Sequence, residues 1–164
     1  MNDPVMTRRA FMATVARTIG SGAALSALLP LASHASTTGA PTTITVYKDP
    51  SCGCCTKWVE HLRSAGLHPT VHDRSDMDAL KDSLGVPAAL RSCHTAVAGR
   101  YVVEGHVPAA DVKRLVAAAP KGIVGIAAPG MPAGSPGMEV PGRADRYDVI
   151  AFAADGTTKL YAHH

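Results

Sequence analysis

The sequence has few aromatic residues and no block of basic residues. Tryptophan, tyrosine and phenylalanine together make up 4% of its 164 residues, and the lysines and arginines are scattered along the chain. Proteins that bind nucleic acid usually combine clustered basic side chains with aromatic rings that stack on bases. We therefore expect no nucleic acid among the partners of this protein.

The chain also lacks an apolar run suited to a permanent membrane span. The apolar stretch near the N-terminus is interrupted by Arg17, and the run after Arg17 is too short. Residues 7–12, TRRAFM, are similar to a twin-arginine export signal, and residues 33–35, SHA, are typical of a signal peptidase site. We expect cleavage after Ala35 and export to the periplasm; an uncleaved N-terminal anchor is the alternative.

This interpretation divides the chain into a signal peptide (1–35), a short linker (36–41) and one domain (42–164). Of the 164 residues, 129 remain after loss of the first 35. That length is enough for one domain with a real core and too short for two. The formal net charge falls from +3 to +1 because the signal segment carries three arginines and one aspartate.

Three of the four cysteines lie within four positions, as Cys52, Cys54 and Cys55. A β-branched run at 42–47 precedes them, and apolar residues at helical spacing follow them, so they lie on a strand-to-helix turn. Free amide N–H groups and the helix dipole favour thiolate at such a turn. Thiolate is the form that binds soft metals and attacks disulfides. The turn is therefore predicted to be a redox or soft-metal site.

The order of predicted elements over residues 42–119 is β-α-β-α-β-β-α. With a C-x-x-C after the first strand, this order predicts an α/β domain with a thioredoxin-like mixed sheet and flanking helices. In that fold the segment that enters the third strand lies opposite the C-x-x-C helix, so we expect Cys93 and His94 to face the cysteine turn. The Pro/Gly-rich residues 125–139 are predicted to form a loop rather than a central strand, and residues 147–161 a β-hairpin.

Four segments of the sequence resemble the CopG-type periplasmic metal-binding family, which is associated with bacterial copper resistance. The resemblance implies a thioredoxin-like fold and a copper-binding cysteine cluster, and it leaves thiol redox activity open. The four segments are residues 46–55 (VYKDPSCGCC), 92–95 (SCHT), 103–110 (VEGHVPAA) and 130–139 (GMPAGSPGME).

Copper(I) prefers thiolate ligands, with thioether and imidazole as supplementary ligands. The sequence gathers these types, and four thiolates can bridge metals, so we expect more than one copper(I) ion. Zinc is a weaker alternative, because structural zinc sites usually pair two separated knuckles. The candidate ligands are Cys52, Cys54, Cys55, Cys93, His94, His106, Met131 and Met138.

Each candidate ligand also has a purely structural interpretation. Cys54 can be a small buried residue, and His94 and His106 can each bond a backbone carbonyl, although for His106 exposure at the surface is the favoured structural interpretation. The methionines can be packing residues on their loop. These alternatives stay open at the level of sequence.

Two functional classes follow from these residues. The first is a copper(I)-binding protein for buffering, transfer or resistance; the second is a periplasmic thiol oxidoreductase in which Cys52 and Cys55 are catalytic and reduce copper or a partner's disulfide. Disulfides that only staple a small exported domain are a third interpretation. The expected partners are copper ions and a periplasmic copper-handling or thiol-redox protein.

Overall fold

The computed structural model describes residues 42–164 of the chain. The predicted signal peptide and linker lie outside the described residues. Within the described part, no helix is both long and apolar enough to cross a membrane.

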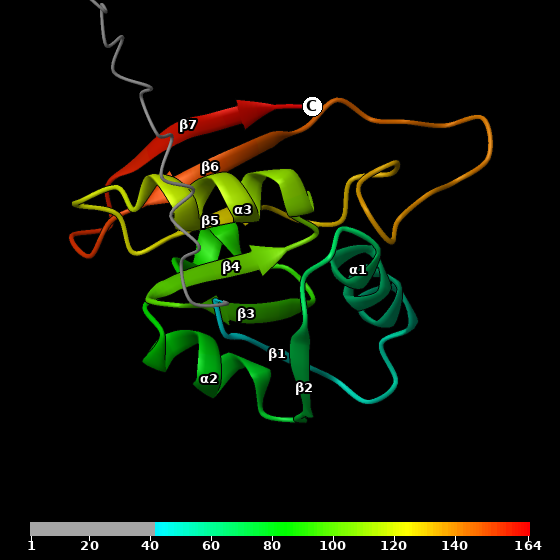
Figure 1. Ribbon diagram of the computed structural model, residues 1–164, viewed down its shortest axis with the longest axis horizontal. Coiled ribbons are helices and arrows are strands. Elements are labelled where there is room, and N and C mark those ends of the chain that lie inside the picture. Colours follow the sequence, from blue (N-terminus) through cyan, green and yellow to red (C-terminus); the bar gives the residue numbers. More distant parts are fainter. Residues whose placement is uncertain (1–41) are drawn as a thin grey trace, which may run out of the picture. The chain divides into compact units, whose positions relative to one another are not determined.

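One seven-stranded mixed sheet forms the centre of the domain, with the strand order β2-β1-β3-β4-β5-β6-β7 (Figure 1). The pairs β1/β2 and β4/β5 are parallel, and the other neighbouring pairs are antiparallel. The strands are β1 (Ile44–Lys48), β2 (Pro69–Asp73), β3 (His94–Ala98), β4 (Tyr101–Gly105), β5 (Gly125–Ala128), β6 (Asp148–Phe152) and β7 (Thr158–His163).

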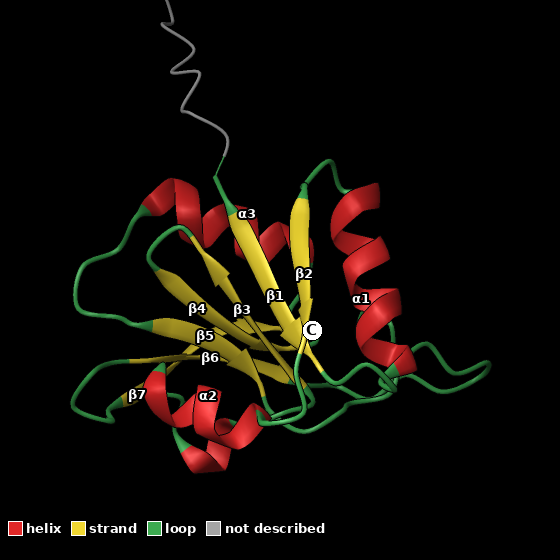
Figure 2. Ribbon diagram, turned by 90° about the horizontal axis from the view of Figure 1, so that it is seen from below, coloured by secondary structure: helices red, strands yellow, loops and turns green. Residues whose placement is uncertain are grey.

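Three α-helices and one short 3₁₀ helix connect these strands. They are α1 (Gly53–Ser64), α2 (Met77–Ser83), η1 (Ala88–Leu90) and α3 (Ala109–Ala118). Helices α1 and α3 touch each other, since His61 accepts the Ala109 N–H at 3.0 Å and Trp58 donates to the Val107 carbonyl at 2.8 Å. Figure 2 shows α2 and α3 on opposite sides of the sheet. The domain is thus a sheet with helices on both faces.

The core is divided between these two faces of the sheet. Successive strand residues point to opposite sides, so Val103 packs beneath α1 and α3 while Val102 packs towards η1. The larger cluster contains the fully buried Trp58 and Leu115. The same alternation places His94 and Thr95, adjacent in sequence, on different faces, which determines their roles in the site.

The sequence-based element order is confirmed up to α3, and the C-terminal hairpin extends the sheet as β6 and β7. Gly66, with a φ of 77°, follows the C-cap residue Ala65 of α1, as its position predicts. Ser75 does not cap α2, because that helix begins after Asp76 and neither side chain makes a capping hydrogen bond.

The prediction of a loop over residues 125–139 is wrong for Gly125–Ala128. These four residues form β5, a buried strand between β4 and β6. A Cβ at Gly125 would lie 2.2 Å from the Val102 carbonyl oxygen, so the glycine permits close approach of the two strands. The high Pro/Gly content begins only at Pro129, after the strand has ended.

Candidate metal site

The cysteine turn lies at the N-terminus of α1. Cys52 is the N-cap residue and has an extended backbone, while Cys55 lies in the first turn and is fully buried. Cys52 and Cys55 are joined by a disulfide, and Cys54 is a partly exposed free thiol. The Sγ of Cys54 lies 3.5 Å from the Sγ of Cys52. Three sulfur atoms therefore meet at one helix end, as the spacing predicts.

Cys93 approaches this turn from the segment that enters β3. Its Sγ lies 3.9 Å from the Sγ of Cys54. The sulfur atoms of Cys52, Cys54, Cys55 and Cys93 all lie within 4.8 Å of one another. The structure thus brings all four cysteines of the chain into one cluster that can bind metal.

His106 lies next to Cys93 and is fully buried, which contradicts the interpretation of an exposed histidine. Its Nδ1–H donates to the Pro136 carbonyl at 2.8 Å, so Nε2 carries the free lone pair. That Nε2 lies 3.0 Å from the Cys93 Sγ. A backbone carbonyl that fixes the tautomer of a metal-binding histidine is a common second contact in metal sites.

His94 is the second imidazole at Cys93. Its Nδ1 lies 3.4 Å from the Cys93 Sγ, and its ring centroid lies 4.3 Å from that of Trp58 and 4.9 Å from that of His106. Within residues 42–164, His94 Nε2 is the single buried side-chain nitrogen or oxygen without a hydrogen-bond partner. Such an atom is costly unless a ligand completes it. One nitrogen of each imidazole and the Cys93 Sγ lie within 4.8 Å of one another.

Burial controls the protonation of these three groups. It holds the pKa of His94 well below 6.5 and lowers that of His106, so both imidazoles are neutral at pH 7. Burial, together with the neighbouring Cys54, raises the pKa of Cys93 to about 12. Cys93 is therefore a thiol in this state, and a metal ion that binds its sulfur displaces a proton.

The Pro/Gly-rich loop after β5 packs against the cysteine turn. Gly137 has a φ of 85°, and a Cβ there would lie 2.8 Å from the Cys54 carbonyl oxygen. This contact places Met138 in a groove that Cys54 also lines. Met131, at the start of the loop, is 57% exposed. Met138 is thus beside the cluster, whereas Met131 does not line this groove.

A buried ion pair lies on the other face of β3 and β4. Lys81 from α2 pairs with Glu104 at 2.5 Å and donates to Thr95 at 2.9 Å, and all three residues are buried. Glu104 also accepts the Ser92 N–H at 2.6 Å, which holds the residue before Cys93. This network was not predicted from the sequence, although one glutamate in an otherwise apolar strand was a usable signal.

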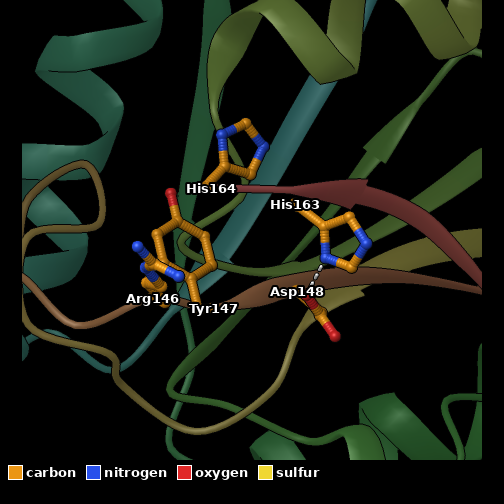
Figure 3. Close-up of a pocket in the computed structure, with 5 residues that line it drawn as sticks. All are labelled: Arg146, Tyr147, Asp148, His163 and His164. Carbon is orange, nitrogen blue, oxygen red and sulfur yellow. Dashed lines mark hydrogen bonds and ion pairs between the residues drawn. The ribbon is translucent and has the colours of Figure 1, made fainter.

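A separate pocket at the C-terminal hairpin contains two further histidines (Figure 3). His163 pairs with Asp148 at 2.6 Å, and His164 pairs with Asp111 of α3 at 2.7 Å. The ring of His164 also stacks on Tyr147, with centroids 5.2 Å apart. None of the cysteines lines this pocket, and its imidazoles are occupied by carboxylates.

These observations define a class of protein: a mixed α/β domain whose cysteine-rich helix turn and two neutral imidazoles offer sulfur and nitrogen donors suited to a soft metal. Thiolate and imidazole are ligands that suit copper(I), and oxygen donors are absent from the two clusters found among the described residues.

Comparisons with known proteins agree with this class. A family described as protein of unknown function DUF411 matches residues 90–138. Two solved structures, named copper resistance protein copG form 1 and form 2, each share 45% sequence identity with this chain at a TM-score of 0.72. The matches cover 76% of this chain and 98% and 99% of those chains, respectively. A comparison with curated proteins gives no match. The chain belongs to the CopG family.

Proposed function

We propose that this protein is an exported copper(I)-binding protein that uses its cysteine cluster for copper buffering, transfer or resistance. The convergence of four sulfur atoms within 4.8 Å of one another is the observation that carries this proposal. The similarity to two structures named as a copper resistance protein supports copper as the metal and resistance as the context.

The proposed ligands are the four cysteines, with His94, His106, Met131 and Met138 as supplementary donors. The neutral state of both histidines supports this set, because a protonated imidazole has no lone pair to offer. Four thiolates exceed the needs of a single copper(I) ion, so bridged binding of more than one ion is expected.

We also assign the domain to the thioredoxin-like class. Support comes from the element order β1-α1-β2-α2-β3-β4-α3 and from the strand order β2-β1-β3-β4. The C-x-x-C at the start of the first helix is the usual position of the redox motif in that class. Export to the periplasm rests on the N-terminal signal pattern alone.

A thiol oxidoreductase is the second candidate function. The Cys52–Cys55 disulfide favours it, because it shows that these two cysteines can pair. Cys52 is the accessible sulfur of the pair and Cys55 the buried one, so an incoming thiolate attacks Cys52 and Cys55 leaves. The two functions are linked, since an oxidised pair offers no thiolate to a metal.

The decisive experiment measures copper(I) bound per chain, together with free thiols, on reduced protein handled without oxygen. We expect more than one copper ion per wild-type chain and a sharp loss of capacity in Cys52→Ser and Cys55→Ser. Ser51→Ala is the matched control, because Ser51 adjoins the cluster without contributing sulfur, and it should keep full capacity. Full copper capacity in both cysteine variants would refute the cluster as the copper site.

Insulin-type disulfide reduction separates the two candidates. A copper carrier should reduce insulin weakly compared with a dedicated exchanger, because this chain has Cys93-His94-Thr95 where exchangers of this class usually carry a Pro-Thr pair. Strong turnover that survives Cys54→Ala together with Cys93→Ala, with unchanged copper tolerance of cells, would establish the oxidoreductase instead.

A further inference from the structure

Cys54 and Cys93 are left as a facing pair of thiols when Cys52 and Cys55 are joined. Cys54 lies in the first turn of α1, and Cys93 precedes β3, so 39 positions of sequence separate them. Their Sγ atoms are 3.9 Å apart in the folded domain. Rotation of two side chains is a small movement compared with the folding that brings them together.

Small molecules in solution can reach Cys54. It lines an open groove of about 370 Å³ together with residues of α1 and of the loop after β5. Cys93 is partly exposed as well, whereas Cys55 of the first pair is fully buried. The other lining residues are Gly53, Lys57, Gly137, Met138, Glu139 and Val140.

We propose that Cys54 and Cys93 form a second dithiol–disulfide couple, which exchanges electrons with small disulfides that enter through this groove. The Cys54 thiolate attacks one sulfur of the small disulfide, forms a mixed disulfide and releases the first small thiol. The Cys93 thiol then gives its proton to His106 Nε2, 3.0 Å away, and its sulfur attacks Cys54 Sγ, forms the Cys54–Cys93 bond and releases the second small thiol, which takes up that proton. Two electrons and two protons leave the protein and end on the two small thiols.

The consequence is a protein that stores four electrons in two couples. A second consequence rests on the proposed copper(I) function. The number of copper ions that the protein can hold would change in steps, because the cluster offers four, two or no thiols according to how many disulfides have formed. After the first oxidation, Cys54 and Cys93 remain with His106 as a reduced ligand set, and the second oxidation removes both sulfurs. The oxidation state of the surroundings would then set how much copper the protein holds.

The test equilibrates copper-free protein with glutathione at a series of oxidised-to-reduced ratios, followed by an acid quench and alkylation. Intact mass spectrometry should show four, then two, then no alkylated thiols in the wild-type chain. Peptide mapping of the last species should identify a Cys54–Cys93 link.

Cys93→Ser is the informative variant, since it keeps the attacking thiol and removes the resolving one. It should accumulate a mixed disulfide of glutathione at Cys54, at least about tenfold above the wild-type level, because a neighbouring thiol competes at high effective concentration. Cys54→Ser is the matched control and should show little mixed disulfide at Cys93, which does not line the groove.

Two results would overturn the proposal: Cys54 and Cys93 that stay alkylatable at every glutathione ratio, or a link from Cys54 to Cys52 in place of Cys93. The wild-type titration decides the matter even where a variant fails to fold. A chain that binds copper(I) but forms one disulfide refutes this inference alone. A chain that titrates through both steps but binds no copper(I) refutes the proposed function alone.

Discussion

The two faces of the β3–β4 hairpin bury polar side chains in opposite ways. On the α2 face, the polar side-chain atoms of Lys81, Thr95 and Glu104 all have hydrogen-bond partners within one network. On the α1 face, His94 keeps a buried nitrogen without a partner, and His106 directs a free lone pair at Cys93. A buried polar network whose atoms all have hydrogen-bond partners stabilises the fold. A buried polar atom without a partner is costly unless a ligand supplies the missing contact. The α2 face therefore supports the hairpin, and the α1 face carries the candidate metal site.

The largest effect on stability is expected from removing the Lys81–Glu104 ion pair on the α2 face. Lys81→Met leaves the fully buried Glu104 without its cation, and removal of one partner from a buried pair typically costs about 3–5 kcal/mol. Chemical denaturation should show this loss in the free energy of unfolding.

The double variant Lys81→Met with Glu104→Gln is the control for that substitution. It removes the charge and keeps an acceptor for the Ser92 N–H, so it should recover part of the stability. A Lys81→Met protein as stable as wild type would show that the ion pair does not support the site.

A smaller effect on stability is expected when acid protonates the buried histidines on the α1 face. The pKa of His94 in the folded state lies well below its ordinary value of 6.5, and that of His106 is also lowered, both mainly by burial. The unfolded chain therefore binds protons more readily below pH 6.5. The free energy of unfolding should therefore have its full value above pH 6.5. As the pH falls below 6.5, it should decrease by up to about 1.4 kcal/mol per pH unit for each histidine.

Denaturation of metal-free protein between pH 5 and 8 measures this slope. His94→Leu should make the free energy of unfolding depend less steeply on pH, by the contribution of one proton. The reason is that an apolar side chain replaces the imidazole that the fold keeps neutral. Equal slopes for wild type and His94→Leu would contradict the buried, neutral assignment of His94.

The smallest effect concerns His61, which joins α1 to α3 outside the cluster. Its Nε2 accepts the Ala109 N–H, and partial burial lowers its pKa, so protonation at low pH breaks this contact. His61→Gln keeps an acceptor and removes the titration. We expect this variant to have nearly the same free energy of unfolding as wild type at pH 7.5, and to lose slightly less of it than wild type when the pH is lowered to 5.5. An equal loss in both proteins would show that this contact does not respond to pH.

Sequence patterns were sufficient to predict the part of the fold that depends on local signals. The β-branched run at 42–47, the helical spacing after the cysteines and the order of predicted elements over residues 42–119 agree with the structure up to α3. Strand β5 was missed because four small residues before Pro129 carry little strand signal, and its place depends on contact between Gly125 and Val102. The position of β5 is therefore determined by its packing against a distant strand, rather than by the strand propensity of its own residues.

The candidate site was predictable only where spacing in the chain implies proximity in space. Cys52, Cys54 and Cys55 are close by sequence, and the fold prediction added Cys93. The Nδ1–H of His106 donates to the Pro136 carbonyl, which the loop brings over from 30 positions away. The Lys81–Glu104 pair likewise joins a helix to a distant strand. The single glutamate in an apolar strand marks one of these residues, but no local pattern identifies its partner or the partner of His106.

X-ray absorption spectroscopy of the reduced, copper(I)-loaded protein tests the copper cluster most directly, because it identifies the atoms bound to copper. We predict a coordination shell dominated by sulfur, with a nitrogen contribution that decreases in His106→Ala and stays unchanged in His68→Ala. A shell made of nitrogen and oxygen without sulfur would contradict the assignment of the cysteine cluster as the copper site.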